Sequence, residues 1–356
     1  MPRPYIGGQA VLEGVFLRAP RSLAVAVRIP DGSIRVRSDP WMPLYQRLKF
    51  ARWPFIRGIF LLWESLRLGW SALSWSGEQA VPPEASPKPS GTEARKGTAG
   101  EKAAMGGTLV VSVLLGLALF VALPHLATDW GSRISGVPLD VERPAFHLVD
   151  GVIKLAVFLA YIALIRRSRD IRRVFEYHGA EHKTIYAWED GLPLTVDAVR
   201  TRSRFHPRCG TSFLIIVVAV SILVFAAAFP LLPRITLEPR FLRNLVQVAV
   251  KLPLLLPVAS VSYELLRLSS RFFHLAPARW LAAPGLALQR LTTDEPDDEQ
   301  IEVALAALHA ALAVEASAPG DVLGIEGEAF RTGASAIARP FHILPRVPVP
   351  PPCSSA

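Results

Sequence analysis

The chain has few charged residues for its length, and this low content argues against an ordinary soluble protein. Charged residues make up 19% of its 356 residues, whereas hydrophobic residues make up 51%. Soluble domains carry about 25% charged residues, and the mean hydropathy of this chain is +0.32. We therefore expect a membrane protein rather than an ordinary soluble enzyme.

The cysteine and glycine contents and the absence of several motifs exclude further classes of protein. Only two cysteines are present, Cys209 and Cys353, which excludes a disulfide scaffold. The 24 glycines are an ordinary number, which excludes collagen, while the 31 prolines predict Pro-rich linkers or tails. The chain has no Walker loop, no G-x-S-x-G motif and no dinucleotide fingerprint. No basic segment followed by a long apolar core opens it, so no secretory signal is expected.

Four apolar segments are long enough to cross a bilayer, which takes about 20 predominantly apolar residues. They cover residues 108–127, 146–165, 211–233 and 245–266. Charges inside them are few and confined to the second and fourth segments. These segments predict a mainly α, helical membrane protein with about four transmembrane helices.

The basic residues predict the orientation of these spans. The net charge is +9, and ten Lys and Arg residues lie at positions 166–208, between the second and third spans. Two Arg residues lie between the first and second spans and three between the third and fourth. Loops rich in Lys and Arg stay in the cytoplasm. We therefore expect a multi-pass protein of the cytoplasmic membrane with both termini in the cytoplasm. Because topology explains the basic residues, nucleic-acid binding is not expected.

Alternating residues near the N-terminus predict a small β-rich cytoplasmic unit over residues 1–50. Residues 24–29 and 34–37 have the pattern of strands, and the turn residues 30–33 join them into a hairpin. The glycine-rich segment ahead of them, which contains Glu13, allows unusual backbone angles or a close approach to another segment. Its role and that of Glu13 are not indicated by the sequence.

The remaining segments follow from composition and helical periodicity. Four tryptophans in residues 51–76 predict an interfacial amphipathic helix, with a soluble helix packed on the hairpin as the alternative. The expected segments after it are a disordered linker at 77–104, a four-span membrane domain at 105–268 with a His/Cys loop at 166–210, a cytoplasmic amphipathic helical segment at 269–315, and a mostly disordered Pro-rich tail at 316–356.

The most informative motif is His178-x-x-Glu181-His182 in the basic segment. On a helix, residues i and i+4 share a face, so both imidazoles can reach one metal ion. Glu181 lies beside that face, where it could act on a water molecule as a general base. This order of residues is the H-x-x-E-H motif of inverzincins. A solvated polar helix face is the alternative explanation.

Further candidate ligands lie elsewhere in the chain. His206 and Cys209, just before the third span, add an imidazole and a thiol, although a polar turn and a buried thiol would give the same pattern. Glu264, near the end of the fourth span, is another candidate and could equally pair with an arginine. We expect a divalent metal, with Zn²⁺ favoured. Four protein ligands would make a closed structural site, and three plus water an open catalytic one.

Several sequence blocks together resemble the YqhQ-like membrane proteins, a bacterial family described as predicted metal-dependent enzymes. The resemblance covers residues from about 5 to 310. It rests on GGQAVLEG (7–14), AVAVR (24–28) with DG (31–32), YHGAEHKT (177–184), HPRCGTSF (206–213), SYE (262–264), and LTT (291–293) with EPDD (295–298). The resemblance implies a membrane protein with a metal site, but no defined reaction or substrate.

These observations support three hypotheses. The first is a metal-dependent hydrolase at the cytoplasmic membrane surface, with Glu181 as general base and a lipid or membrane-protein segment as substrate. The second is a non-catalytic scaffold, or an assembly or quality-control factor, whose metal staples the loop to the spans. The third, a transporter, rests only on Asp150 and Lys251 inside the spans. The oligomeric state is not indicated.

Overall fold

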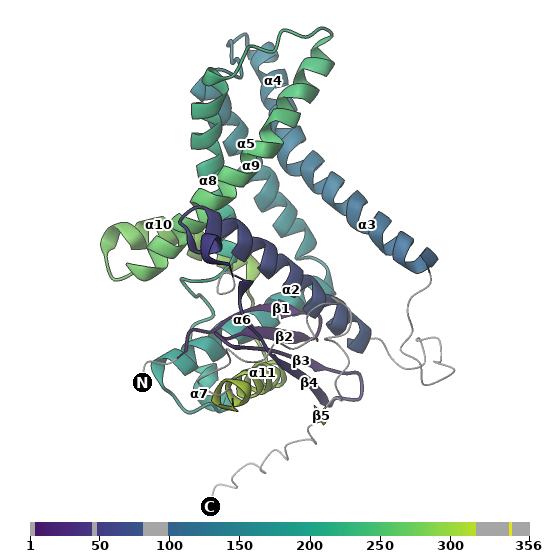
Figure 1. The fold of residues 1–356 in the computed structure, drawn as a ribbon, viewed down its shortest axis with the longest axis vertical. Coiled ribbons are helices and arrows are strands. Elements are labelled where there is room, and N and C mark those ends of the chain that lie inside the picture. The colour runs from purple at the N-terminus through teal and green to yellow at the C-terminus, as the bar shows by residue number, and fades with distance from the viewer. Residues whose placement is uncertain (1–3, 45–47, 81–98, 318–341, 344–356) are drawn as a thin grey trace, which may run out of the picture.

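The computed structural model describes residues 4–44, 48–80, 99–317 and 342–343. A bundle of long apolar helices stands on a base that contains a β-sheet (Figure 1). The predicted fold class is confirmed: the described chain is mostly helical and contains a small antiparallel sheet near its N-terminus.

The sheet is an antiparallel meander. Its strands are β1 (Gly7–Val11), β2 (Gly14–Arg18), β3 (Ser22–Arg28), β4 (Ile34–Pro40) and the short β5 (His342–Ile343), in that spatial order. The predicted hairpin is β3–β4, which closes where Arg28 pairs with Ile34. The β1–β2 hairpin was not predicted. It turns at Leu12 and Glu13, where Glu13 has a φ of 51°.

Both faces of the sheet are covered, which explains why β2 is buried along nearly its whole length. Alternate strand residues point to opposite faces. Val15 and Leu17 pack with α6 (Arg169–Asp190) and α11 (Asp298–Ser317), whereas Phe16 packs with α2 (Ile56–Ala80) on the other face. The sheet therefore holds α6, the helix of the His-x-x-Glu-His motif, against α11.

Helix α2 is amphipathic. Its Ala72 and Trp75 are buried on the sheet, while Trp63 and Leu66 are 53% and 74% exposed. Gly58 lets α2 cross the last bundle helix closely, since a Cβ there would lie 2.9 Å from Tyr263. The helix continues four residues beyond the expected boundary at 76. Residues 81–98 of the expected linker lie outside the described residues, whereas its last part, 99–104, is helical and belongs to α3 (Ala99–Leu117) rather than to a linker.

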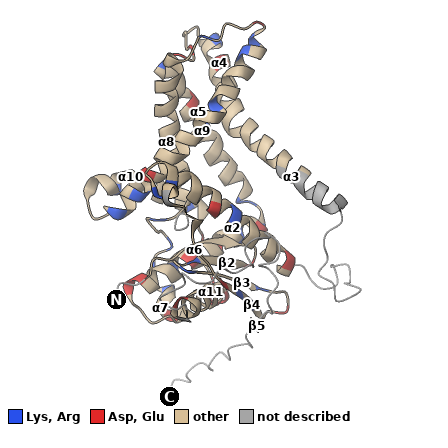
Figure 2. Ribbon diagram, in the orientation of Figure 1, with Lys and Arg blue, Asp and Glu red and all other residues tan. Residues whose placement is uncertain are grey.

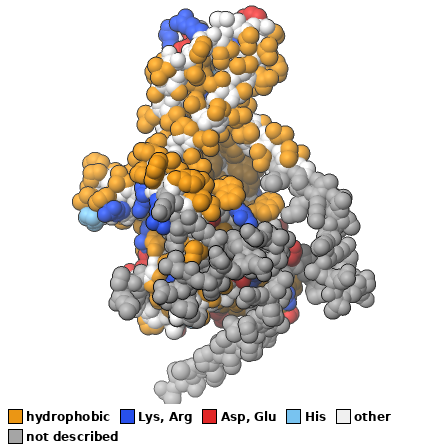
Figure 3. Space-filling view, viewed as in Figure 1, with side chains coloured by type: hydrophobic (Ala, Val, Ile, Leu, Met, Phe, Trp, Pro, Cys, Tyr) orange, Lys and Arg blue, Asp and Glu red, His pale blue; other side chains and the backbone are white. Residues whose placement is uncertain are grey.

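In the described part of the chain, four helices are long and apolar enough to cross a membrane, which confirms the predicted number of spans. The bundle is made of α3 (Ala99–Leu117), η2 (Ala118–Ala122) and α4 (Leu123–Ser135) in continuous succession, α5 (Pro144–Ile165), α8 (Thr211–Ala228) with η3 (Phe229–Leu231), and α9 (Arg240–Arg271). Apolar side chains cover its surface, and charged residues gather at its two ends with few between them (Figures 2 and 3). The bundle therefore has the surface of a membrane domain.

The segment after the fourth span forms two helices. Helix α10 (Ala276–Thr292) projects sideways at the junction of bundle and base, and α11 then packs under the sheet (Figure 1). Ile301, Leu305 and Leu308 of α11 are buried there, as their helical spacing predicts. A short helix, α7 (Val196–Arg200), follows α6. Most of the expected disordered tail lies outside the described residues.

Candidate metal centre

Helix α6 carries the motif and is buried on all sides around it. Every residue from Tyr177 to Ile185 is buried. Gly179 permits this, because a Cβ there would lie 2.1 Å from the backbone oxygen of Asp294. The amide of Asp294 also donates to the carbonyl of Phe175 at 2.9 Å. The segment that joins α10 to α11 therefore crosses α6 directly at the motif.

Backbone carbonyls orient the two motif histidines. Nδ1 of His178 lies 2.8 Å from the oxygen of Thr292, and Nδ1 of His182 lies 2.5 Å from that of Arg204. A carbonyl only accepts, so each Nδ1 carries the hydrogen and each Nε2 keeps its lone pair. Metal-ligating histidines show this arrangement, in which the distal N–H is held by an acceptor. The two ring centroids are 4.4 Å apart.

Cys209 brings a sulfur to the same place from the segment that precedes α8. Its Sγ lies 3.2 Å from Nε2 of His178, and one nitrogen of each histidine and this sulfur all lie within 4.8 Å of one another. The amide and hydroxyl of Thr211, at the start of α8, lie 3.4 and 3.1 Å from the sulfur. The thiolate is the form of cysteine that binds metals. We call His178, His182 and Cys209 the centre.

Glu181 is buried beside the centre but outside it. One of its carboxylate oxygens is 4.0 Å from Nε2 of His178. Among the residues that the structure describes, no group donates a hydrogen bond to this carboxylate. Burial raises the pKa of Glu181, against smaller opposing effects of His178 and His206. Gly8 of β1 makes room for it, since a Cβ there would lie 3.0 Å from Oε1 of Glu181 and 2.6 Å from the oxygen of Phe16.

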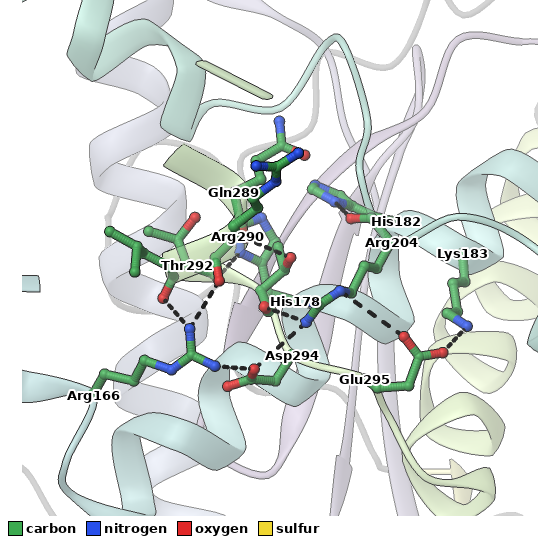
Figure 4. Close-up of polar contacts among 12 residues, drawn as sticks. Arg166, His178, His182, Lys183, Arg204, Gln289, Arg290, Thr292, Asp294 and Glu295 are labelled. Atoms are coloured by element: carbon green, nitrogen blue, oxygen red, sulfur yellow. Dashed lines mark hydrogen bonds and ion pairs between the residues drawn. The ribbon is translucent and has the colours of Figure 1, made fainter. Parts of the chain in front are cut away.

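A network of ion pairs fastens the supporting segment around the centre (Figure 4). Arg166 and Arg204 both contact Asp294, the latter at 3.5 Å, and Lys183 contacts Glu295. Arg204 also donates to the carbonyl of Thr293 at 2.7 Å. The segments around Thr292 and Arg204, whose carbonyls lie against the histidine Nδ1 atoms, are thus linked to each other and to α6.

The structure does not bring His206 into the centre. Its Nε2 lies 3.4 Å from Glu189, and its Nδ1 accepts from the amide of Arg208 at 3.3 Å, so both ring nitrogens have partners. Gln289 holds its backbone through two hydrogen bonds of 2.8 Å. Burial lowers the pKa of His206 to about 4. Its ring lies 5.6 Å from that of His182, so His206 lines the centre rather than completing it.

Glu264 also lies outside the centre, and its expected alternative role is the observed one. Arg57 of α2 donates to Oε1 of Glu264 at 2.7 Å and contacts Oε2 as well. The amide of Phe55 donates to Oε1 at 3.1 Å. Glu264 therefore fastens α2 to α9, because the close crossing at Gly58 places Arg57 beside it.

The two charged residues that suggested transport do meet inside the bundle. Nζ of Lys251 lies 3.0 Å from one oxygen of Asp150, and Nζ of Lys154 lies 3.3 Å from the other. Asp150 and Lys251 are almost completely buried. We call Asp150, Lys154 and Lys251 the bundle triad.

Several residues that shape the centre carried no recognisable role in the sequence. The carbonyls of Thr292 and Arg204 could not be singled out, since every residue has one. Glu13 lay in a block with family resemblance, and it accepts two hydrogen bonds from Arg173 of α6, at 2.6 and 2.5 Å. The two glycines, Gly8 and Gly179, were the available signals, because a glycine beside a candidate ligand indicates a close approach.

Comparison with known proteins gives two matches. Residues 53–314 match a family described as "Protein of unknown function (DUF1385)". The chain is also 34% identical over 326 residues to "Uncharacterized protein YqhQ" of Bacillus subtilis (strain 168), which covers 88% of this chain and 94% of that protein. Neither description names a metal or a reaction. No solved structure matches the chain.

Proposed function

This chain belongs to the DUF1385 family, and we propose that it is a metal-dependent membrane hydrolase whose metal is held by His178, His182 and Cys209. One observation carries the proposal: two nitrogens and a sulfur converge while both histidine Nδ1 atoms are held from outside by carbonyls. Among the described residues, the inward-facing nitrogen lone pairs are left without a hydrogen-bond donor other than the Cys209 thiol. A cation fits such a place, because it satisfies all three atoms at once.

The donor set suits zinc in particular. Imidazole and thiolate together select Zn²⁺ over Mg²⁺ or Ca²⁺, which prefer oxygen. Three protein ligands with a free fourth position are typical of catalytic zinc, whereas structural sites have four. His206 and Glu264, the other candidate ligands, have partners of their own. The geometry therefore favours an open site over a closed one.

Glu181 supplies the base that hydrolysis needs. When bound, a zinc ion contributes Lewis acidity to water and to a substrate carbonyl or phosphoryl group. The carboxylate of Glu181 takes a proton from the attacking water and returns it to the leaving group, so that water is added across the cleaved bond. Its position 4.0 Å from Nε2 of His178 keeps it next to the ligands without adding a fourth.

The basic residues supply the orientation. Ten Lys and Arg residues lie between the second and third spans, against two and three in the other loops. By the positive-inside rule, the sheet and its helices lie in the cytoplasm together with both termini, and the bundle spans the cytoplasmic membrane. A substrate would then reach the centre from the membrane surface, as a lipid or a membrane-protein segment does.

A scaffold function is the second candidate, and a specific observation favours it. The ligands and their supports come from four separate segments: α6, the loop at Arg204, the turn at Cys209 and the α10–α11 connection. A metal there would staple the base to the ends of two spans without any reaction. The two candidates differ in what they require of Glu181.

Metal content of the purified protein, measured by elemental mass spectrometry, tests the site. We expect about one zinc per chain in the wild type and almost none in His178→Ala or Cys209→Ala. Glu264→Gln is the matched control and should keep the metal. A wild type that holds no metal, prepared without chelators and with zinc supplied, would contradict the proposal.

Glu181→Gln separates the hydrolase from the scaffold. In the hydrolase it keeps the zinc and the fold but loses turnover, because the amide cannot take the proton. The measurement is the release of products from membrane lipids when the purified protein is incubated in vesicles, followed by mass spectrometry. Equal product release by wild type and Glu181→Gln would count against a catalytic role for the site.

A further inference from the structure

A hollow of about 340 Å³ lies between α10 and the segment that leads into α8. Its wall is almost wholly apolar and aromatic, with one cation. The lining includes Tyr186, Phe205, Pro207, Phe273, Leu286 and Arg290. Hollows of this size hold small organic molecules, and an apolar wall with a single polar group is their usual composition. The hollow is open to the outside, so its occupant need not be enclosed.

Residues next to the ends of two spans line this hollow, and they indicate its depth relative to the bilayer. Pro207 lies four residues before α8 begins, and Phe273 lies two residues after α9 ends. Its other wall, α10, carries Trp280, which is 76% exposed, and Trp side chains prefer the bilayer interface. Apolar side chains cover α10 on the face seen in Figure 3. The hollow therefore lies at the depth of the lipid headgroups.

Arg290 gives the hollow its charge. Its backbone carbonyl accepts a hydrogen bond from Arg166, but its side chain is exposed and has no acidic partner among the described residues. A guanidinium at headgroup depth matches phosphate in charge and in its two parallel N–H donors. The apolar remainder of the wall matches the first carbons of the acyl chains. The combination fits an anionic phospholipid.

The hollow adjoins the centre. The ring of Tyr186, which lines it, packs on the ring of His206 with centroids 4.5 Å apart. The ring of His206 in turn lies 5.6 Å from that of His182. The side chains of Tyr186 and His206 thus stand between a molecule held in the hollow and the ligand His182.

We infer that the hollow binds an anionic phospholipid, with the phosphate on Arg290 and the acyl chains running from α10 into the bilayer. The binding itself needs no metal. The further step, that this lipid is the substrate class of the centre, rests on the proposed function. Lipid binding and metal binding can therefore fail independently, and each failure is recognisable.

Binding of radiolabelled phosphatidylglycerol to the purified full-length chain in detergent tests the inference. We expect Arg290→Gln to weaken binding about tenfold, because a charge-assisted contact to phosphate is lost. Arg290→Lys should keep most of the affinity, since an ammonium still binds phosphate. Arg279→Gln is the matched control, as Arg279 is exposed on the same helix but does not line the hollow. It should change binding by no more than about twofold.

Three competitions complete the experiment. Unlabelled phosphatidylglycerol should displace the label, while phosphatidylcholine and inorganic phosphate should not. Displacement by inorganic phosphate would assign the site to free phosphate and overturn the lipid. Displacement by phosphatidylcholine, or equal losses in Arg290→Gln and Arg279→Gln, would leave no charge-specific site in the hollow.

His178→Ala separates this inference from the proposed function. It should bind phosphatidylglycerol like the wild type, and Arg290→Gln should keep the zinc of the wild type. If lipid binding follows this pattern while the wild type holds no zinc, the lipid site is supported and the metal-dependent hydrolase is contradicted. If zinc binds while every variant binds lipid alike, the metal centre is supported and lipid binding in the hollow is contradicted.

Discussion

Two of the buried polar clusters in the described part of the chain, the centre beside the sheet and the bundle triad in the membrane domain, are built in opposite ways. In the centre, hydrogen-bond partners stand outside and hold the rings by Nδ1, so the inner atoms face one another. In the triad, the charged atoms are each other's partners: both lysines contact the carboxylate of Asp150. The centre therefore suits the metal ion that we propose, whereas the charges of the triad compensate one another.

The difference teaches where to look for function among buried polar residues. A buried charge must be compensated, and in the triad the compensation is another side chain of the same protein. A buried lone pair that is oriented by the protein but left without a donor is compensated by something else. By that criterion the centre is the better candidate for chemistry, although an ionisable residue inside a membrane span is also a functional candidate.

The largest expected effect comes from removing the carboxylate of the triad. Asp150→Ala leaves two buried ammonium groups without a counter-charge, and breaking such a pair costs roughly 3–5 kcal/mol. Lys251→Met should cost far less, because it leaves the Asp150–Lys154 pair intact. The measurement is the midpoint of thermal unfolding in detergent. If the two variants melt alike, the triad is not held together by its charges.

The next largest effect is stabilisation by zinc, which should depend on the centre and not on the bundle triad. A ligand at about a hundred times its Kd stabilises the folded state by about 2.7 kcal/mol. After chelation, added zinc should raise the unfolding midpoint of the wild type and of Lys251→Met, but not that of Cys209→Ala. A comparable rise in Cys209→Ala would mean that zinc acts outside the centre.

Gly179→Ala tests whether the carbonyl that orients His178 contributes to metal binding at the centre. The new Cβ would lie 2.1 Å from the oxygen of Asp294, so the segment that holds Thr292 must move away from His178. Loss of such an outer partner weakens metal binding by about 10–100-fold. Competition with a chromophoric chelator measures the affinity.

Gly210→Ala is the matched control for this change, because a Cβ at Gly210 meets nothing within 4 Å even though Gly210 follows the ligand Cys209. It should bind zinc like the wild type. Unchanged zinc affinity in Gly179→Ala would show that the carbonyl of Thr292 does not contribute to the site.

Features with a local cause were predictable. The four spans follow from apolar length, the β3–β4 hairpin from alternation and turn residues, and the buried face of α11 from helical spacing. The meeting of His178 with His182 follows from their i, i+4 spacing alone. Cys209 could be proposed by residue type, because few other side chains ligate zinc.

Features with a tertiary cause were not predictable. The partner of Glu264 depends on how closely α2 crosses α9, and nothing near Glu264 in sequence indicates Arg57. His206 has the chemistry of a ligand, but Glu189 and the amide of Arg208 occupy its ring. The β1–β2 hairpin escaped detection because glycine is a poor strand residue and Gly8 serves the packing of Glu181.

The smallest expected effect is at Glu13, on the edge of the centre. Its carboxylate accepts two hydrogen bonds from Arg173 and so fastens the β1–β2 turn to α6. Both side chains are partly exposed, and such pairs contribute about 0.2–1 kcal/mol. Glu13→Gln should therefore lower the unfolding midpoint slightly and leave the zinc content unchanged, because the histidines are oriented by Thr292 and Arg204 rather than by the sheet. Loss of zinc in this variant would contradict that division. It would mean that docking of the sheet, through Gly8 and Glu181, belongs to the support of the centre as much as the two carbonyls do.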